Sequence, residues 1–377
     1  MSPTTSLLLT LCALLETAQG GAAGLDRRAA LERAAAEERA QDFSSAARTV
    51  EELLSAAPND LELLVRAGLL RARGDFHELA QAHLEAAVKL APSKREVWLA
   101  LGEAQCRAQR LQGAVESFRK AQILDDADGL PSNGLGAALY FLAQIDEARA
   151  ALETAAKRNP RLPGPRHMLG RIALDEARYD DAIRWFSECT QMDDRDAESW
   201  SRLGVAFQKK AQNEKAIEAY RSALKYDPLD LGARQNLGRL LMDLGRDAEG
   251  KAELETHAKL VRGKQRLTLA LESLKLEPAS VRSRVAVGDA LLQLGSHREA
   301  LSHYREALRG KNPPAAAYLG AAKAFDALGE VSSRDRLAAR ALEVGRDDAA
   351  LVTEAKTLME KPASQPASAP AGKEGVR

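Results

Sequence analysis

Residues 197–230 read AESWSRLGVAFQKKAQNEKAIEAYRSALKYDPLD, and this stretch decides the fold. It places large and small side chains at positions 4, 7, 8, 11, 20, 24, 27 and 32 of the stretch, namely Trp200, Leu203, Gly204, Phe207, Ala216, Tyr220, Ala223 and Pro228. The same offsets return when the sequence is compared with itself in steps of 34 residues. A fixed period of this length indicates a repeat architecture.

Repeats in the same register start at residues 27, 61, 95, 129, 163 and 231. Their best-kept positions are the small and aromatic ones, among them Trp98, Gly102, Gly136, Gly170 and Gly238. The repeat that starts at residue 27 matches only in its second half. This is expected of a terminal repeat, because one of its faces meets solvent.

The offsets resemble the signature of the tetratricopeptide repeat family. The resemblance implies an all-α fold, an α-solenoid in which about nine helix-turn-helix repeats stack into a superhelix. Small residues at positions 8, 20 and 27 should let the two helix axes approach, while large residues at positions 4, 7, 11 and 24 fill the space between them. Replacing Gly204 or Ala216 by Leu should overpack such a contact and cost roughly 1–3 kcal/mol.

The repeat signature covers residues 27–264 as seven repeats and residues 281–348 as two more, the first of which contains Gly288. Between them lie the extra residues 265–280, QRLTLALESLKLEPAS, whose apolar residues are spaced for one helix face. Two interpretations stay open: an extra helix that changes the curvature of the superhelix, or a degenerate half repeat that has lost its first helix. Residues 349–360 are expected to form a capping helix.

Both ends differ from the array. Residues 1–24 resemble a secretory signal peptide, with the apolar run Leu7–Leu15 and small residues after it. The alternative is an apolar first helix that packs on the array. The run is too short to cross a membrane comfortably, so no stable span is expected after signal removal. The signal predicts a periplasmic or secreted protein; without it the protein would be cytoplasmic. Residues 361–377, rich in Pro and Ala, are expected to be disordered.

Composition and motifs point away from catalysis, metal binding and nucleic acids. The 54 Lys and Arg residues are balanced by 54 Asp and Glu residues, without the basic excess of nucleic-acid-binding proteins. The three cysteines form no CxxC motif and no Cys/His cluster, so no metal site is expected. The acidic run Asp125–Gly129 lacks the Glu of a calcium loop, because Leu135 stands at that position. No nucleotide-binding loop, HExxH or nucleophile–base motif occurs, so neither enzymatic activity nor a cofactor is expected.

The resemblance also implies where a partner would bind. In this family the first helix of each repeat lines the concave surface, which places positions 2, 5, 9 and 12 inward. In the early repeats these positions are acidic and apolar: Glu62, Val65, Leu69, Glu96, Leu99 and Glu103. In the later repeats they are basic or amide-bearing, and the candidate partner-binding residues are His167, Arg171, Gln208, Gln235, Arg239 and Arg282, with Lys323 beyond them and Tyr140 between the two sets. The arginines could pair with carboxylates of an extended peptide. The alternative is that these are ordinary solvated residues on helices.

The function that follows is a protein–protein interaction scaffold whose concave groove binds a peptide or partner protein. An alternative is a non-catalytic accessory subunit that assembles an enzyme or secretion complex, or delivers its substrate. Because both ends of the array look capped, a monomer or a member of a hetero-complex is expected, not a self-stacking fibre.

Overall fold

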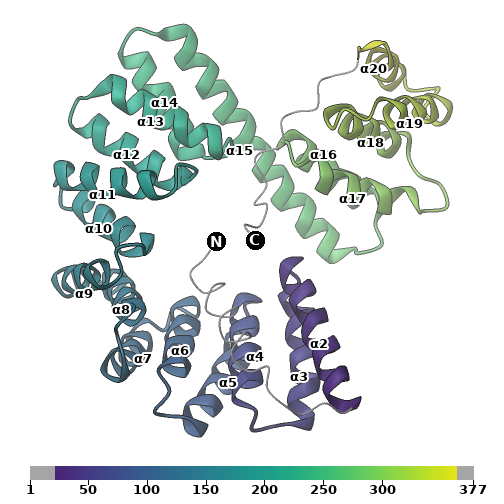
Figure 1. Cartoon of the computed structure of the whole chain (residues 1–377). Helices are drawn as coiled ribbons and strands as arrows, with labels where there is room; N and C mark the ends of the chain where they lie inside the picture. Colours follow the sequence, from purple (N-terminus) through teal and green to yellow (C-terminus); the bar gives the residue numbers. More distant parts are fainter. Residues whose placement is uncertain (1–21, 363–377) are drawn as a thin grey trace. The chain divides into compact units, whose positions relative to one another are not determined.

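The computed structural model of the chain describes residues 22–362, and within them it contains helices and no strands. Figure 1 shows the helices following one another as antiparallel pairs. Nine pairs and one last helix occupy this range: α2 (Ala22–Arg39), α3 (Phe43–Ala56), α4 (Leu61–Arg73), α5 (His77–Leu90), α6 (Arg95–Arg107), α7 (Leu111–Leu124), α8 (Leu130–Phe141), α9 (Ile145–Arg158), α10 (Pro163–Asp175), α11 (Tyr179–Met192), α12 (Ala197–Lys209), α13 (Asn213–Tyr226), α14 (Leu231–Asp243), α15 (Asp247–Leu276), α16 (Val281–Gln293), α17 (His297–Leu308), α18 (Ala315–Ala327), α19 (Val331–Val344) and α20 (Ala349–Glu360). The expected all-α solenoid is confirmed.

The chain divides into two compact bodies, Met1–Asp194 and Arg195–Arg377. The described helices of the first body are α2–α11, and those of the second are α12–α20. In each body a first helix packs on its own second helix, which then packs on the first helix of the next repeat. Each repeat therefore covers the apolar face of its neighbour, which is why the stack is stable and a single repeat is not.

Within each helix pair, the residue at position 8 of the first helix packs against the residue at position 24 of the second helix. A β-carbon placed on the glycine at position 8 would lie between 2.5 and 2.8 Å from the large side chain at position 24 of the same repeat, which is closer than real β-carbons approach. The pairs are Gly68 with Leu84, Gly102 with Phe118, Gly136 with Leu152, Gly170 with Phe186, Gly204 with Tyr220, Gly238 with Leu254, and Gly288 with Tyr304. The alanines at position 20, Ala216 among them, are fully buried. The two tryptophans at position 4 are half-buried, and the Trp98 indole nitrogen donates to the carbonyl of Pro92 at 2.8 Å.

The turn inside each pair has a common backbone geometry. In all nine repeats the residue at position 15 has a positive φ; it is glycine at Gly245, Gly295 and Gly329, and a residue with a side chain in the other six. The next residue donates its amide to the carbonyl five positions earlier, as Gln212 does to Phe207 at 2.9 Å. This is the Schellman ending of a helix, in which a left-handed residue satisfies the last carbonyls.

The turns between repeats are built by acidic and hydroxyl caps. Asp60, Asp196 and Asp230 each accept hydrogen bonds from amides in the first turn of the following helix, which leaves fewer unpaired donors there. In the acidic run Asp125–Gly129, the Asp128 carboxylate accepts from the amide of Leu130 and pairs with Arg95 at 2.8 Å. These carboxylates are therefore used for capping and ion pairing.

Helix α15 differs from the expected layout. It runs without a break from Asp247 to Leu276, so residues 265–276 continue the second helix of the seventh repeat and do not form a helix of their own. The reason lies in the sequence: Arg262 occupies position 32, where a proline often ends the second helix, and the next proline is Pro278. Helix α14 packs on the first half of α15, where Gly238 meets Leu254, and α16 packs on the second half, around Leu267, Ala270 and Leu274.

Helix α20 covers the end of the array as a single helix, packing Ala355 and Leu358 against α18 and α19. Beneath it, the fully buried Arg334 donates to Asp326 at 2.9 Å and to Asp335 at 2.8 Å. The expected signal peptide lies almost wholly, and the expected disordered tail largely, outside the described residues. Among the described helices, none combines the length and the apolar character that crossing a bilayer requires.

Candidate functional site

The first helices form the inner side of each body. In the first body α4 packs on α6, α6 on α8, and α8 on α10, whereas no comparable packing joins consecutive second helices there. These consecutive first helices touch each other, and the consecutive second helices do not. Each body is therefore expected to curve towards its first helices, whose exposed side chains then share one concave face. We refer to this surface as the first-helix face.

On the first-helix face of the first body, an arginine side chain lies over two aromatic rings. The Arg171 guanidinium of α10 lies 5.0 Å from the ring centroid of Tyr140 and 5.8 Å from that of Phe141, both at the end of α8. The two rings meet edge to face, with centroids 5.4 Å apart. Phe141 remains 57% exposed, which is unusual for a side chain of its size. We name Tyr140, Phe141, Arg171 and Asp175 the Arg171 cluster.

The carboxylate of this cluster is engaged by tyrosine and not by arginine. The Tyr140 hydroxyl donates to Asp175 at 2.6 Å, and partial burial together with this carboxylate raises the pKa of the Tyr140 phenol, against the opposing charge of Arg171. The Arg171 guanidinium also contacts the Met168 sulfur, at 4.0 Å. Arg171 is therefore held in place by aromatic rings while its charge has no carboxylate partner among the described residues.

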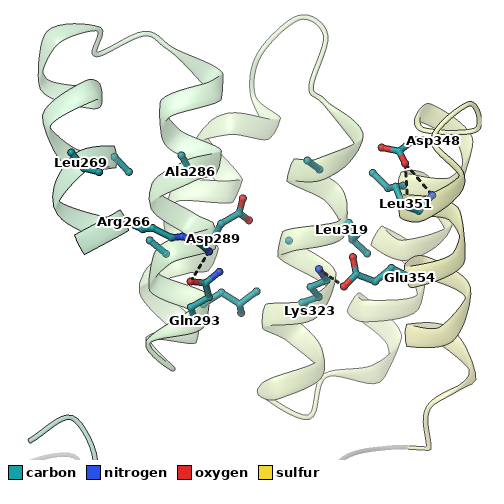
Figure 2. A pocket seen from close by; sticks show the side chains of 16 residues that line it. Arg266, Leu269, Ala286, Asp289, Gln293, Leu319, Lys323, Asp348, Leu351 and Glu354 are labelled. Atoms are coloured by element: carbon teal, nitrogen blue, oxygen red, sulfur yellow. Dashed lines mark hydrogen bonds and ion pairs between the residues drawn. The ribbon is translucent and has the colours of Figure 1, made fainter. Parts of the chain in front are cut away.

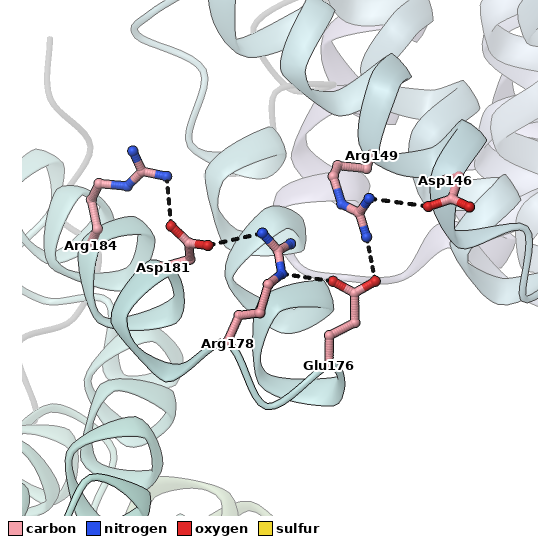
Figure 3. A network of polar contacts seen from close by, with 6 residues as sticks. All are labelled: Asp146, Arg149, Glu176, Arg178, Asp181 and Arg184. Carbon is pink, nitrogen blue, oxygen red and sulfur yellow. Dashed lines mark hydrogen bonds and ion pairs between the residues drawn. The ribbon is translucent and has the colours of Figure 1, made fainter.

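Neighbouring arginines are used differently. Arg149, Arg178 and Arg184 belong to a chain of ion pairs that runs from α9 through the α10–α11 turn into α11 (Figure 3). Arg178 joins Glu176 and Asp181, each at 2.9 Å. The outer members are well exposed, so each pair adds little stability, but together they occupy the charge of these arginines. Arg171 differs from them in having no such carboxylate in the part of the chain that the structure describes.

The other predicted site residues fall into two groups. His167 and Gln208 serve packing: the His167 ring stands edge-on to Phe186 with centroids 5.6 Å apart, and Gln208 accepts a hydrogen bond from Tyr220 at 2.8 Å. Gln235 on α14 is half-buried, whereas Arg239 on α14 and Arg282 on α16 are exposed. The latter two have no ion pair among the described residues. Arg239 and Arg282 lie on separate helices that do not pack on each other as other first helices do.

The acidic character expected of the early repeats is offset by arginines. Glu62 lies 3.9 Å from Arg27, and Arg73 pairs with Glu38. Burial raises the pKa of the Glu103 carboxyl, while the charges of Arg107 and Arg73 lower it in part. Burial and the nearby Glu103 raise the pKa of the Cys106 thiol to about 11, which disfavours the reactive thiolate at neutral pH. No group of three or more potential metal-ligating side chains is assembled among residues 22–362.

Models of one family match most of this repeat array. Two models described as "Tetratricopeptide repeat" match residues 139–343 and residues 64–129. The chain belongs to the tetratricopeptide repeat family. Over 139 residues, 36% of the chain, it is 27% identical to "BBSome complex member BBS4" of Bos taurus, and the match covers 26% of that protein. The chain thus spans about a quarter of the length of this curated relative.

Parts of this chain are also similar to solved structures of other proteins. MamA of Desulfovibrio magneticus RS-1 is 20% identical with a TM-score of 0.42, over 45% of this chain and 95% of that one. YrrB, described as "a TPR protein with an unusual peptide-binding site", is 23% identical with a TM-score of 0.39, over 50% of this chain and 96% of that one.

Position counting found part of the Arg171 cluster and missed the rest. Arg171 and Tyr140 stand at positions 9 and 12, which the family resemblance places inward. Phe141 and Asp175 stand at position 13, outside the positions that the resemblance places inward. A usable signal was present, because position 13 of one first helix is one turn from position 9 and so shares its face.

Proposed function

We propose that this TPR protein is a non-catalytic interaction scaffold that binds a peptide or partner protein on the first-helix face of its first body, at the Arg171 cluster. One observation carries the proposal: a guanidinium without a carboxylate partner among the described residues is held over two aromatic rings, one of which is largely exposed. Aromatic side chains and arginine are the residues that most often dominate binding energy in protein interfaces.

The chemistry of the cluster indicates what it would bind. The fork of the Arg171 guanidinium matches a carboxylate, and the exposed ring of Phe141 offers an apolar contact beside it. We therefore expect a segment that carries an acidic side chain next to an apolar one. Because the two rings hold Arg171 in place, little side-chain entropy is lost when the segment binds.

Binding is tested by alanine substitution of the cluster. Arg171→Ala and Phe141→Ala should each remove a specific partner from cross-linked complexes isolated from the native cell. The matched control is Arg184→Ala, because Arg184 also lies over an aromatic ring, that of Trp185 at 4.5 Å, but on the second helix α11. If the same partners are recovered with all three variants at equal yield, the cluster is not the binding site. Thermal unfolding of each variant checks that the fold is retained.

We also propose that the protein is exported, on the strength of the apolar run and small residues in positions 1–24. N-terminal sequencing of the mature chain tests this. A mature chain that starts near residue 21 supports export, and one that starts at residue 1 or 2 contradicts it.

A further inference from the structure

The second half of α15 is a second helix without a first helix of its own. Helix α16 begins five residues after α15 ends, as α14 begins five residues after α13 ends. Residues 263–276 of α15 therefore correspond, position by position, to Asn213–Tyr226 of α13. In this correspondence Arg266, Leu269 and Ala270 take the places of Ala216, Ala219 and Tyr220.

The corresponding side chains differ sharply in exposure. In α13, Ala216 and Ala219 are 0% and 2% exposed, because α12 covers them. In α15, Leu269 is 66% exposed, and Arg266 is exposed as well. Helix α14 does not reach them: its contacts lie further back along α15, where Arg234 pairs with Glu253 at 2.5 Å. Among the described residues, no preceding first helix covers this side of the second half of α15, whereas α16 packs on its other side.

The side chains of α16 also indicate that a preceding first helix is missing. In the first body, positions 9 and 13 of α10, Arg171 and Asp175, contact position 12 of the preceding first helix α8, Tyr140. Positions 9 and 13 of α16 are Asp289 and Gln293. Helices α14 and α16 do not pack together as the other consecutive first helices of this body do, so these side chains face no preceding first helix.

A hollow of about 850 Å³ lies at this place (Figure 2). Arg266 and Leu269 line it from α15, Ala286, Asp289 and Gln293 from α16, and residues of α18 and α20 close its far side. We call this hollow the α15 slot. Several lining residues are alanine or glycine, so the walls leave room for side chains that enter from outside.

The charges in the α15 slot are not all satisfied internally. Asp289 accepts a hydrogen bond from Tyr304 at 2.6 Å, and Lys323 pairs with Glu354 at 2.7 Å. Arg266 donates to the amide oxygen of Gln293, at 3.3 Å, and has no carboxylate partner among the described residues. The slot thus offers a cation without a counter-charge beside an exposed leucine.

We propose that the α15 slot binds an amphipathic helix of a partner protein, which takes the place of the missing first helix. The other repeats support this occupant, because in each of them a first helix covers the corresponding side of the second helix. The occupant should differ from those helices in two ways. It should carry a large residue at position 8, since Ala270 replaces the usual large residue at position 24. It should also carry a carboxylate at position 12. The small residue that usually stands at position 20 contacts position 12, and here Arg266 stands at position 20.

A labelled peptide derived from this chain tests the proposal. The probe copies Ala197–Lys209 of α12 with two changes, Gly204→Leu and Gln208→Glu, and its binding to the full-length protein is measured by fluorescence anisotropy. Leu269→Asp should weaken binding at least about tenfold, because a leucine loses its apolar contact. Arg266→Glu should weaken it about fivefold, the range of a partly exposed ion pair. A second peptide with Gln208→Lys should prefer the Arg266→Glu protein.

Control variants distinguish binding in the α15 slot from binding elsewhere on the protein. Leu276→Asp changes a leucine of α15 that is 84% exposed and lies outside the slot, so it should leave the affinity unchanged. The proposal is overturned if the peptide does not bind at about 1 mM, or binds all variants equally. It is also overturned if Arg266→Glu turns a concentration-dependent dimer into a monomer, which assigns the slot to a second copy. Tighter peptide binding after removal of residues 1–21 would assign it to that segment. Since Arg171 and Phe141 lie on a different body, failure here leaves the Arg171 cluster unaffected.

Discussion

The ring of Tyr220 lies directly against the backbone of Gly204, so closely that a β-carbon on Gly204 would stand 2.6 Å from the ring atoms Cδ1 and Cε1. The ring is fully buried and its hydroxyl donates to Gln208, so it cannot swing away. Gly204→Ala should therefore push α12 from α13 and destabilise the second body by roughly 1–3 kcal/mol, measured by urea unfolding. Gly232→Ala is the control, because only a side-chain oxygen of Asp230 approaches that site, and helix propensity should make it neutral or slightly stabilising.

This contact explains why the fold could be predicted from sequence. An aromatic residue at position 24 can contact the backbone of a glycine at position 8 only when the two helices pack closely. The shared 34-residue period of these two positions therefore indicates the helix pairing directly. The same reasoning could not settle α15. Its apolar residues fit one helix face whether or not the helix stops near Arg262, and only the packing of α14 and α16 on its two halves shows that it continues.

The site was less predictable than the fold. Inward positions could be counted, but counting does not show which side chains are already engaged. Gln208 and Arg171 both stand at counted positions. Gln208 is engaged, because it accepts a hydrogen bond from the Tyr220 hydroxyl. Arg171 lies over Tyr140 without a carboxylate partner, because the Tyr140 hydroxyl donates to the nearby carboxylate. Such choices depend on three-dimensional neighbours in adjacent helices.

At position 15 the left-handed backbone conformation should strain any residue other than glycine, and this strain should be measurable as a loss of stability. Ala211 has a φ of 56°, whereas Gly245 occupies the equivalent place with a φ of 74°, and no atom lies within 4 Å of where its β-carbon would stand. Gly245→Ala should destabilise the second body by about 1 kcal/mol, because only backbone strain is added. Ala211→Gly should cost less than Gly245→Ala or raise stability slightly, since relief of strain opposes the added chain entropy. Equal destabilisation by both changes, in urea unfolding, would contradict this account.

A buried arginine makes the first body sensitive to acid. Arg71 donates to Glu51 at 2.8 Å, and His83 lies 3.0 Å from the same carboxylate, so these contacts lower the pKa of Glu51 from its ordinary value of 4.5. A lowered carboxyl pKa stabilises the folded state fully above the unfolded value, and this stabilisation is lost as the pH falls through the folded value. The protection of the α3 and α5 amides, measured as exchange relative to the intrinsic rate at each pH, should therefore fall below about pH 4.5.

The corresponding variant, Glu51→Gln, should lose about 1–2 kcal/mol at neutral pH, since charged hydrogen bonds are broken at a site still partly in contact with water. It should also show a flatter acid dependence. Glu52→Gln is the control, because Glu52 is 72% exposed and pairs with Arg33 at the surface. If both variants retain the acid dependence of the parent protein, the triad of Glu51, Arg71 and His83 does not cause it.

The continuity of α15 can be tested where the repeat pattern would have ended the helix. Arg262 is exposed and has no ion pair among the described residues, so Arg262→Pro breaks no ion pair. In a continuous helix the proline removes one backbone hydrogen bond and clashes with the preceding turn, which should cost about 3 kcal/mol. Amide exchange should then accelerate around residues 258–266, while Arg262→Ala leaves it unchanged. If the chain already turned here, as it does at Pro228, the proline would be tolerated and both variants would exchange alike.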